Sequence, residues 1–161
     1  MGVRAFYRVI DQPLQEQIRG GGLSYEDIDR APHAGEFDLD QCFQGLHWVL
    51  TEGLEAGEHD DSPASSLILG DEWYPEDESA AWHLVPAERL PSIHRELCAW
   101  DRDMMVDFAV MNHLEEQCLY AFDGGDPGEL VRRDIWPFFT RLRERVGDAA
   151  EEGRALIMRL L

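Results

Sequence analysis

Lysine is absent from this sequence of 161 residues, so all fourteen basic side chains are arginines, against 33 aspartates and glutamates. The formal net charge is −19 with histidine neutral. A negative field of this size repels the phosphates of nucleic acids and of anionic membranes, and it accelerates encounters with basic proteins. We therefore predict no nucleic-acid partner and no membrane partner, and we favour a basic protein as the ligand.

Long apolar runs are also missing. The first apolar segment, residues 2–10, carries Arg4 and Arg8 within it, so it lacks the uninterrupted apolar stretch of a secretory signal. No run approaches the ~18 consecutive apolar residues of a membrane-spanning helix. These absences favour a cytoplasmic protein.

Cysteine is scarce and occurs at Cys42, Cys98 and Cys118. An odd number of cysteines at wide spacing is not typical of a disulfide framework, nor of a zinc site, which needs ligands at short, fixed intervals. Each cysteine lies within an apolar helical pattern. We therefore expect three reduced thiols that pack in the core.

Complete catalytic motifs are lacking as well. The glycines at 20–22 are not followed by the Gly-Lys-Ser/Thr of a phosphate loop, and neither Ser65 nor Ser66 lies in a Gly-x-Ser-x-Gly turn. His113 and Glu116 are spaced for one helical turn, but no further ligand stands at a fixed interval from them. We therefore predict no metal, no cofactor and no catalytic residue, and we interpret this histidine as solvated.

Apolar residues make up 44% of the chain and five tryptophans are present, which is enough for one well-packed core. Alternation of β-branched and aromatic residues predicts a strand at residues 3–10. A short apolar run predicts an interior strand at residues 80–85, and the apolar segment after Gly153 predicts a closing strand at residues 154–160. Helical patterns fill much of the remainder, including residues 104–122. No repeat or domain boundary interrupts residues 1–161. The sequence predicts a single α+β domain in which a small mixed sheet is packed by several helices.

The strongest helix signal covers residues 38–52. Asp38 and Gln41 form a capping-box pattern at its start, and Gly53 supplies its end. Between these ends, apolar residues at intervals of three and four form one stripe: Leu39, Cys42, Phe43, Leu46, Val49 and Leu50. This stripe is predicted to face the core.

A histidine and a tryptophan lie side by side in this helix. His47 is about 80° from the centre of the stripe, at its border, where packing is the simplest interpretation. Trp48 lies roughly opposite the stripe. Either a second element covers its indole, or Trp48 belongs to an exposed apolar patch that marks an interface, and we favour the cover because Gly45 permits close approach. The same pairing recurs at Trp82 and His83, where strand alternation sends the two side chains to opposite faces of the sheet.

The order of these segments resembles a known family. An opening strand is followed by a segment that contains an Asp, an aromatic residue and the sequence Gly-Leu-His. A short helix comes next, which contains a Pro and a Leu and ends in Leu-Gly. The matching residues here are Asp40, Phe43, Gly45, Leu46 and His47, then Pro63, Leu67, Leu69 and Gly70. The pattern resembles the YfbM-like family of bacterial proteins, known as domain of unknown function 1877. The final strand after Gly153 resembles the family's ending, whereas residues 104–122 offer only Tyr120 to match a Tyr-Pro element. The resemblance implies an α+β fold and no established activity.

Two function hypotheses remain open. The first is a non-enzymatic binding protein whose acidic surface meets a basic protein, as an inhibitor of a cationic toxin does. The second is a small-metabolite enzyme or binding protein in which His47, at a pocket rim, acts as general acid or base. That pocket would be lined by His47, Gln44 and either Trp48 or Trp82. A buried imidazole held by backbone carbonyls would remove the second hypothesis.

Overall fold

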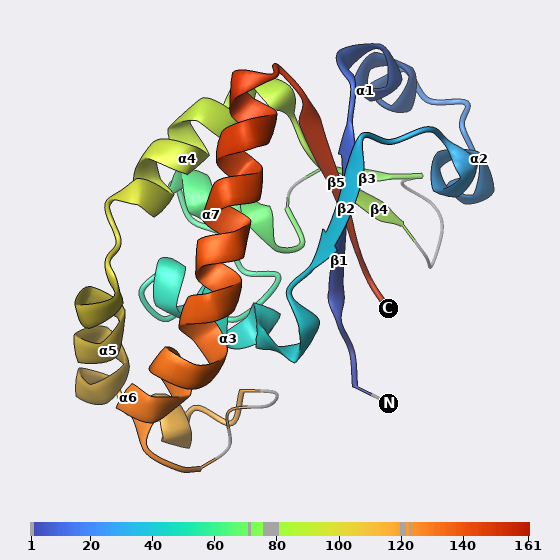
Figure 1. The fold of residues 1–161 in the computed structure, drawn as a ribbon. Helices are drawn as coiled ribbons and strands as arrows, with labels where there is room; N and C mark the ends of the chain where they lie inside the picture. Colours follow the sequence, from blue (N-terminus) through green and yellow to red (C-terminus); the bar gives the residue numbers. More distant parts are fainter. Residues whose placement is uncertain (1, 71, 76–80, 120–121, 123) are drawn as a thin grey trace.

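A computed structural model of the chain describes residues 2–70, 72–75, 81–119, 122 and 124–161. Its strands form one five-stranded sheet in the order β2-β1-β5-β4-β3, with helices on both faces (Figure 1). The strands are β1 (Ala5–Ile10), β2 (Gly35–Asp38), β3 (Glu72–Tyr74), β4 (Trp82–Val85) and β5 (Ala155–Leu160). The helices are α1 (Gln12–Arg19), α2 (Tyr25–Arg30), α3 (Phe43–Leu50), α4 (Leu90–Cys98), α5 (Arg102–Met111), α6 (Pro127–Leu130) and α7 (Trp136–Glu151).

Every pairing in the described part of the sheet is antiparallel. The α+β class is therefore confirmed, but the sheet is antiparallel rather than mixed. The central strand β5 and its neighbour β1 come from opposite ends of the chain and pair from Ala5 with Leu160 to Ile10 with Ala155. Their relative direction depends on how the intervening helices return the chain to the sheet, and a local residue pattern does not encode that path.

The three predicted strands are present, with bounds within two residues of those expected; residue 80 lies outside the described residues. The sequence pattern missed β2 and β3, which are the edge strands of the sheet. β2, Gly-Glu-Phe-Asp, contains three poor strand formers, whereas β3, Glu-Trp-Tyr, has two aromatic strand formers but only three residues. Neither segment is long enough to show a clear alternation, and pairing with β1 and β4 completes their strand conformation.

Helices cover both faces of the sheet and create two cores. Figure 1 shows α1 and α2 on one side, and α3, α4, α5 and α7 on the other. Alternation along β1 places Tyr7 in the larger core with α3, α4 and α7, and Ile10 in the smaller core with α1 and α2. In β4, Trp82 lies in the smaller core, while His83 pairs with Met158, a residue of the larger core. Trp82 and His83 therefore face opposite sides of the sheet, as predicted.

The first helix of the larger core, α3, begins later than predicted. Asp38 is not its N-cap, because pairing of β2 with β1 holds this residue in a strand. The Asp38 carboxylate instead accepts a hydrogen bond from the backbone N–H of Asp40 at 3.0 Å. A short 3₁₀ helix, Asp40–Cys42, then leads into α3. α3 also ends two residues before the predicted end, at Leu50. Glu52 takes the left-handed conformation after it with a φ of 56°, and Gly53, with a φ of 118°, donates its N–H to the carbonyl of Trp48 at 2.8 Å.

The helix predicted over residues 104–122 is shorter than expected. α5 ends at Met111, and His113 then adopts a left-handed conformation with φ 53° and ψ 58°. The chain folds back, so that the N–H of Gly124 bonds to the carbonyl of Glu115 at 3.0 Å. Tyr120, the one match to the family's Tyr-Pro element, lies outside the described residues.

The C-terminal helical segment is continuous but irregular. α6 passes through a π-helical turn, Val131–Ile135, into α7, whose first turn contains Pro137. Gly153, with a φ of 64°, follows α7 and begins the return into β5. None of the helices within the described residues is long and apolar enough to cross a membrane.

Candidate functional site

The imidazole of His47 is buried rather than placed at a pocket rim. The residue is 1% exposed, and the loop after α3 closes over its ring. Its Nε2 lies 3.0 Å from the carbonyl oxygen of Glu58. Burial lowers the pKa of His47 below its ordinary value of 6.5, so the ring is neutral and donates Nε2–H to Glu58. The prediction of a rim histidine was wrong because a helical wheel does not include the loop that covers it.

Two other histidines hold the same region through backbone carbonyls. His59 Nδ1 lies 2.8 Å from the carbonyl of Ser65, and His83 Nδ1 lies 3.4 Å from the carbonyl of Gly70. The rings of His47 and His59 meet edge to face with centroids 6.0 Å apart. Burial also lowers the pKa of His83. These three imidazoles stabilise the chain between α3 and β4 by bonding to its backbone carbonyls. Because the ring of His47 is buried, it cannot contact a bound substrate to transfer a proton.

The expected cover over Trp48 is present. Trp48 is buried against Phe108 of α5, with ring centroids 5.0 Å apart, so α3 lies between two layers. A β-carbon at Gly45 would lie 2.7 Å from Cε2 of Phe122. Glycine at this position therefore permits the close approach that the sequence predicted.

Trp82 lies on the far side of the sheet from His47 and makes a different set of contacts. The guanidinium carbons of Arg8 and Arg159 lie 5.0 Å and 4.5 Å from its ring. Both arginines also pair with Asp29, at 3.4 Å and 2.8 Å. This cluster ties α2 to the sheet, and the predicted grouping of Trp82 with His47 does not exist.

Gln44 is the predicted site residue that does line a hollow. A cavity of about 310 Å³ is bounded by Gln44, Glu55, Ala56, Gln117, Cys118 and Leu119. Neither His47, Trp48 nor Trp82 contributes to it. Apart from Gln44, the lining of this hollow could not be predicted from local patterns, because its walls come from α3, the following loop and the segment after α5.

The cysteines differ from one another in burial. Cys42 is buried as expected, its thiol donates to the carbonyl of Asp134, and burial raises its pKa to about 12. Cys98 and Cys118 are exposed, so their assignment to the core was wrong. Cys98 Sγ lies 3.5 Å from His94 Nε2, a pairing that the four-residue spacing on one helix could have signalled.

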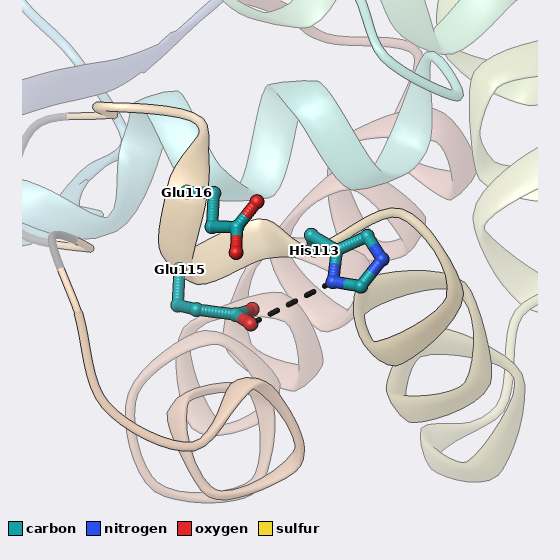
Figure 2. Close-up of side chains that lie close together, drawn as sticks. All are labelled: His113, Glu115 and Glu116. Carbon is teal, nitrogen blue, oxygen red and sulfur yellow. Dashed lines mark ion pairs between the residues drawn. The ribbon is translucent and has the colours of Figure 1, made fainter.

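A cluster of potential ligands follows α5. His113, Glu115 and Glu116 each place a ligand atom within 4.8 Å of the others. Figure 2 shows the Glu115 carboxylate directed at the imidazole of His113, with Oε1 and Nδ1 3.8 Å apart. The sequence had paired His113 with Glu116 and missed Glu115, which the left-handed turn at His113 brings close. His113 and Glu116 are exposed, and we interpret the cluster as part of the acidic surface.

The comparisons now place this geometry in a family. The model of a domain of unknown function, DUF1877, matches residues 1–159.

The chain belongs to the DUF1877 family.

The structure of this DUF1877 protein is similar to the crystal structure of YfbM from Escherichia coli, a protein of unknown function. The TM-score is 0.73 at 17% sequence identity, with 98% of this chain and 99% of YfbM covered. At this identity the likeness shows the fold alone. No match was found among curated proteins.

The residues that carry the DUF1877 resemblance in this chain are mostly structural. Leu46 is fully buried, His47 is 1% exposed, and Leu67 is 1% exposed and accepts a hydrogen bond at its carbonyl from the hydroxyl of Tyr7. These residues join α3, the segment after it and the sheet. The family pattern therefore reflects residues that stabilise the fold of this DUF1877 domain. Binding residues are expected on its surface instead.

Two segments of the DUF1877 domain that are rich in acidic residues and poor in arginine lie close together. Residues 52–62 contain five acidic residues and no arginine, and residues 101–116 contain five acidic residues and one arginine. The two segments meet at Trp100, which lines a hollow of about 200 Å³ with Glu52, Asp60 and Glu96, and whose ring contacts Phe108 of α5. We call residues 52–62 and 101–116 the acidic face.

Proposed function

We propose that this DUF1877 protein is a non-enzymatic binding protein for a basic protein partner. The observation that carries the proposal is the acidic face, where ten acidic residues stand against one arginine. Ion pairs elsewhere use arginines internally: Arg19 bonds to Glu72 and Glu88, and Arg8 and Arg159 bond to Asp29. Their charge is thus neutralised away from the acidic face, which a basic surface would complement.

The competing metabolite hypothesis loses its main support. It required His47 to open into a pocket beside a second polar group, whereas the ring is 1% exposed and held by the carbonyl of Glu58. The hollow beside Gln44 has no imidazole in its described lining. A binding role needs only the surface charge and shape that the acidic face offers.

A reducing compartment fits the same proposal. Cys98 and Cys118 are exposed free thiols, which persist unpaired where thiols are kept reduced. We therefore extend the proposal to a cytoplasmic protein that meets its partner in the same compartment.

The test is affinity capture on the immobilised protein from a native lysate of the source cell, at ~0.05 M and ~0.5 M salt, because salt screens exposed charges over about 10 Å at 0.1 M. An unrelated acidic protein of similar net charge serves as the control bait. We expect a basic protein that is retained at low salt by this bait only and released at high salt. Retention of the same proteins by both baits, or of none, would contradict the proposal.

A further inference from the structure

Helix α5 presents apolar side chains to solvent on an otherwise charged surface. Met104 is 45% exposed, Val110 is 47% exposed and Met111 is 77% exposed. Met104 and Met111 are seven residues apart, so they lie about 20° from each other on the helix. The half-buried Phe108 lies beside them, and its ring contacts the ring of Trp100. Figure 1 shows α5 at the outer edge of the helical layer, farthest from the sheet.

Carboxylates interrupt and border this apolar strip. Asp107 lies between Met104 and Met111, one turn from each, and Asp103 shares the adjacent row with Val110. Asp103, Asp107 and Glu116 are exposed, and within the described residues Asp107 makes no ion pair. Arg102, the one basic residue of α5, places its Nε 4.0 Å from a carboxylate oxygen of Asp103. Both side chains are exposed, so this pair is weak and the Asp103 carboxylate is accessible to a second cation.

We propose that α5 is the docking surface for a cationic amphipathic helix of the basic partner, an inference that rests on the proposed function. A helix with apolar residues at intervals of three and four would place them on Met104, Val110 and Met111. Its flanking arginines or lysines would meet Asp103 and Asp107. Methionine suits such a contact, because its flexible thioether adapts to partner side chains.

Charge decides against a second copy of this chain as the occupant. A two-fold dimer through α5 would bring the same patch together from both protomers, so Asp103 and Asp107 would face their own copies or neighbouring carboxylates. Like charges placed opposite one another across an interface oppose association. A cationic segment has the opposite sign at every one of these contacts.

The neighbouring hollow offers a further contact for the same partner. Glu52, Asp60 and Glu96 line it together with Trp100, whose ring is 6.4 Å from Phe108 of α5. A long cationic side chain at the end of the docked helix would reach carboxylates and an indole face at this point. The apolar strip and the acidic hollow thus form one continuous surface.

The experiment titrates the purified protein with a synthetic amphipathic peptide of leucine and lysine, and with a scrambled peptide of the same composition, at low salt. The test variants are D103N/D107N and M104S/M111S. The matched controls are E144Q/D148N, which removes two exposed carboxylates at the same spacing on α7, and V3S/L161S, which removes two exposed apolar side chains elsewhere.

We expect the amphipathic peptide to bind more tightly than the scrambled one. D103N/D107N and M104S/M111S should each weaken binding roughly fivefold, and the controls less than twofold. Binding that is weakened equally by test and control variants would overturn the assignment to α5 while leaving the proposed function intact. Failure of the wild-type protein to bind either peptide would overturn the docking assignment, and the affinity capture described above then decides separately whether the proposed function stands.

Discussion

Substitution of His47 tests whether the region after α3 is held by a neutral, buried imidazole. Its ring is 1% exposed and donates to the carbonyl of Glu58, and burial lowers its pKa below 6.5. In the unfolded chain the ring takes up a proton near pH 6.5, which the folded protein resists. The stabilisation is therefore complete above that pH and is lost progressively as pH falls toward the lower, folded-state pKa.

The magnitude follows from the linkage between proton binding and folding. If His47 stays neutral in the folded state, the free energy of unfolding falls by up to about 2 kcal/mol between pH 7 and pH 5 from this residue alone. His83, whose pKa is also lowered by burial, adds a smaller amount because it is only partly buried.

Urea unfolding of the wild type and of His47→Gln at pH 7, 6 and 5 measures this effect. Glutamine keeps an amide donor for the Glu58 carbonyl but cannot titrate, so the variant should lose less stability on acidification than the wild type. His113→Gln, at a side chain that is 64% exposed, is the control and should behave as the wild type. Equal losses of stability in the wild type and in His47→Gln would refute the assignment of a buried neutral imidazole.

Two further predictions concern the core and the thiols. Leu46→Ala, at a fully buried position in the larger core, should lower the free energy of unfolding by ~2–5 kcal/mol, and an unchanged urea midpoint would show that the α3 stripe is misplaced. A thiol reagent at neutral pH should modify Cys98 and Cys118 in the folded protein but Cys42 only after unfolding. The reason is that burial raises the pKa of the Cys42 thiol to about 12. Rapid modification of all three cysteines would contradict the buried environment of Cys42.

Local periodicity predicted the parts of the fold that carry their own pattern. Alternation identified β1, a short apolar run identified β4, and the apolar segment after Gly153 identified β5, while the stripe from Leu39 to Leu50 identified α3. The edge strand β2 lacks such a pattern, so Asp38 was taken for a helix cap. Pairing across the sheet, which depends on residues far away in sequence, decides its conformation.

The candidate site was harder to predict, because loops determine it. The wheel for α3 placed Trp48 and Gly45 correctly, since their need for cover follows from the helix alone. It failed for His47, because the covering residues, Glu55 and Glu58, follow the end of α3. The net charge follows from the composition. The composition does not show, however, that acidic residues lie beside exposed methionines, because this arrangement depends on where α5 ends, at Met111.

Amide chemical-shift mapping of the isotope-labelled protein with the leucine and lysine peptide tests the central claim most directly. The proposed binding mode predicts that the largest shift changes fall on residues 101–116 and on the adjacent loop 52–62, and that they vanish at ~0.5 M salt as exposed charges are screened. Shift changes concentrated on another surface, such as β3 with its exposed Trp73, or changes that persist at high salt, would contradict recognition through the acidic face.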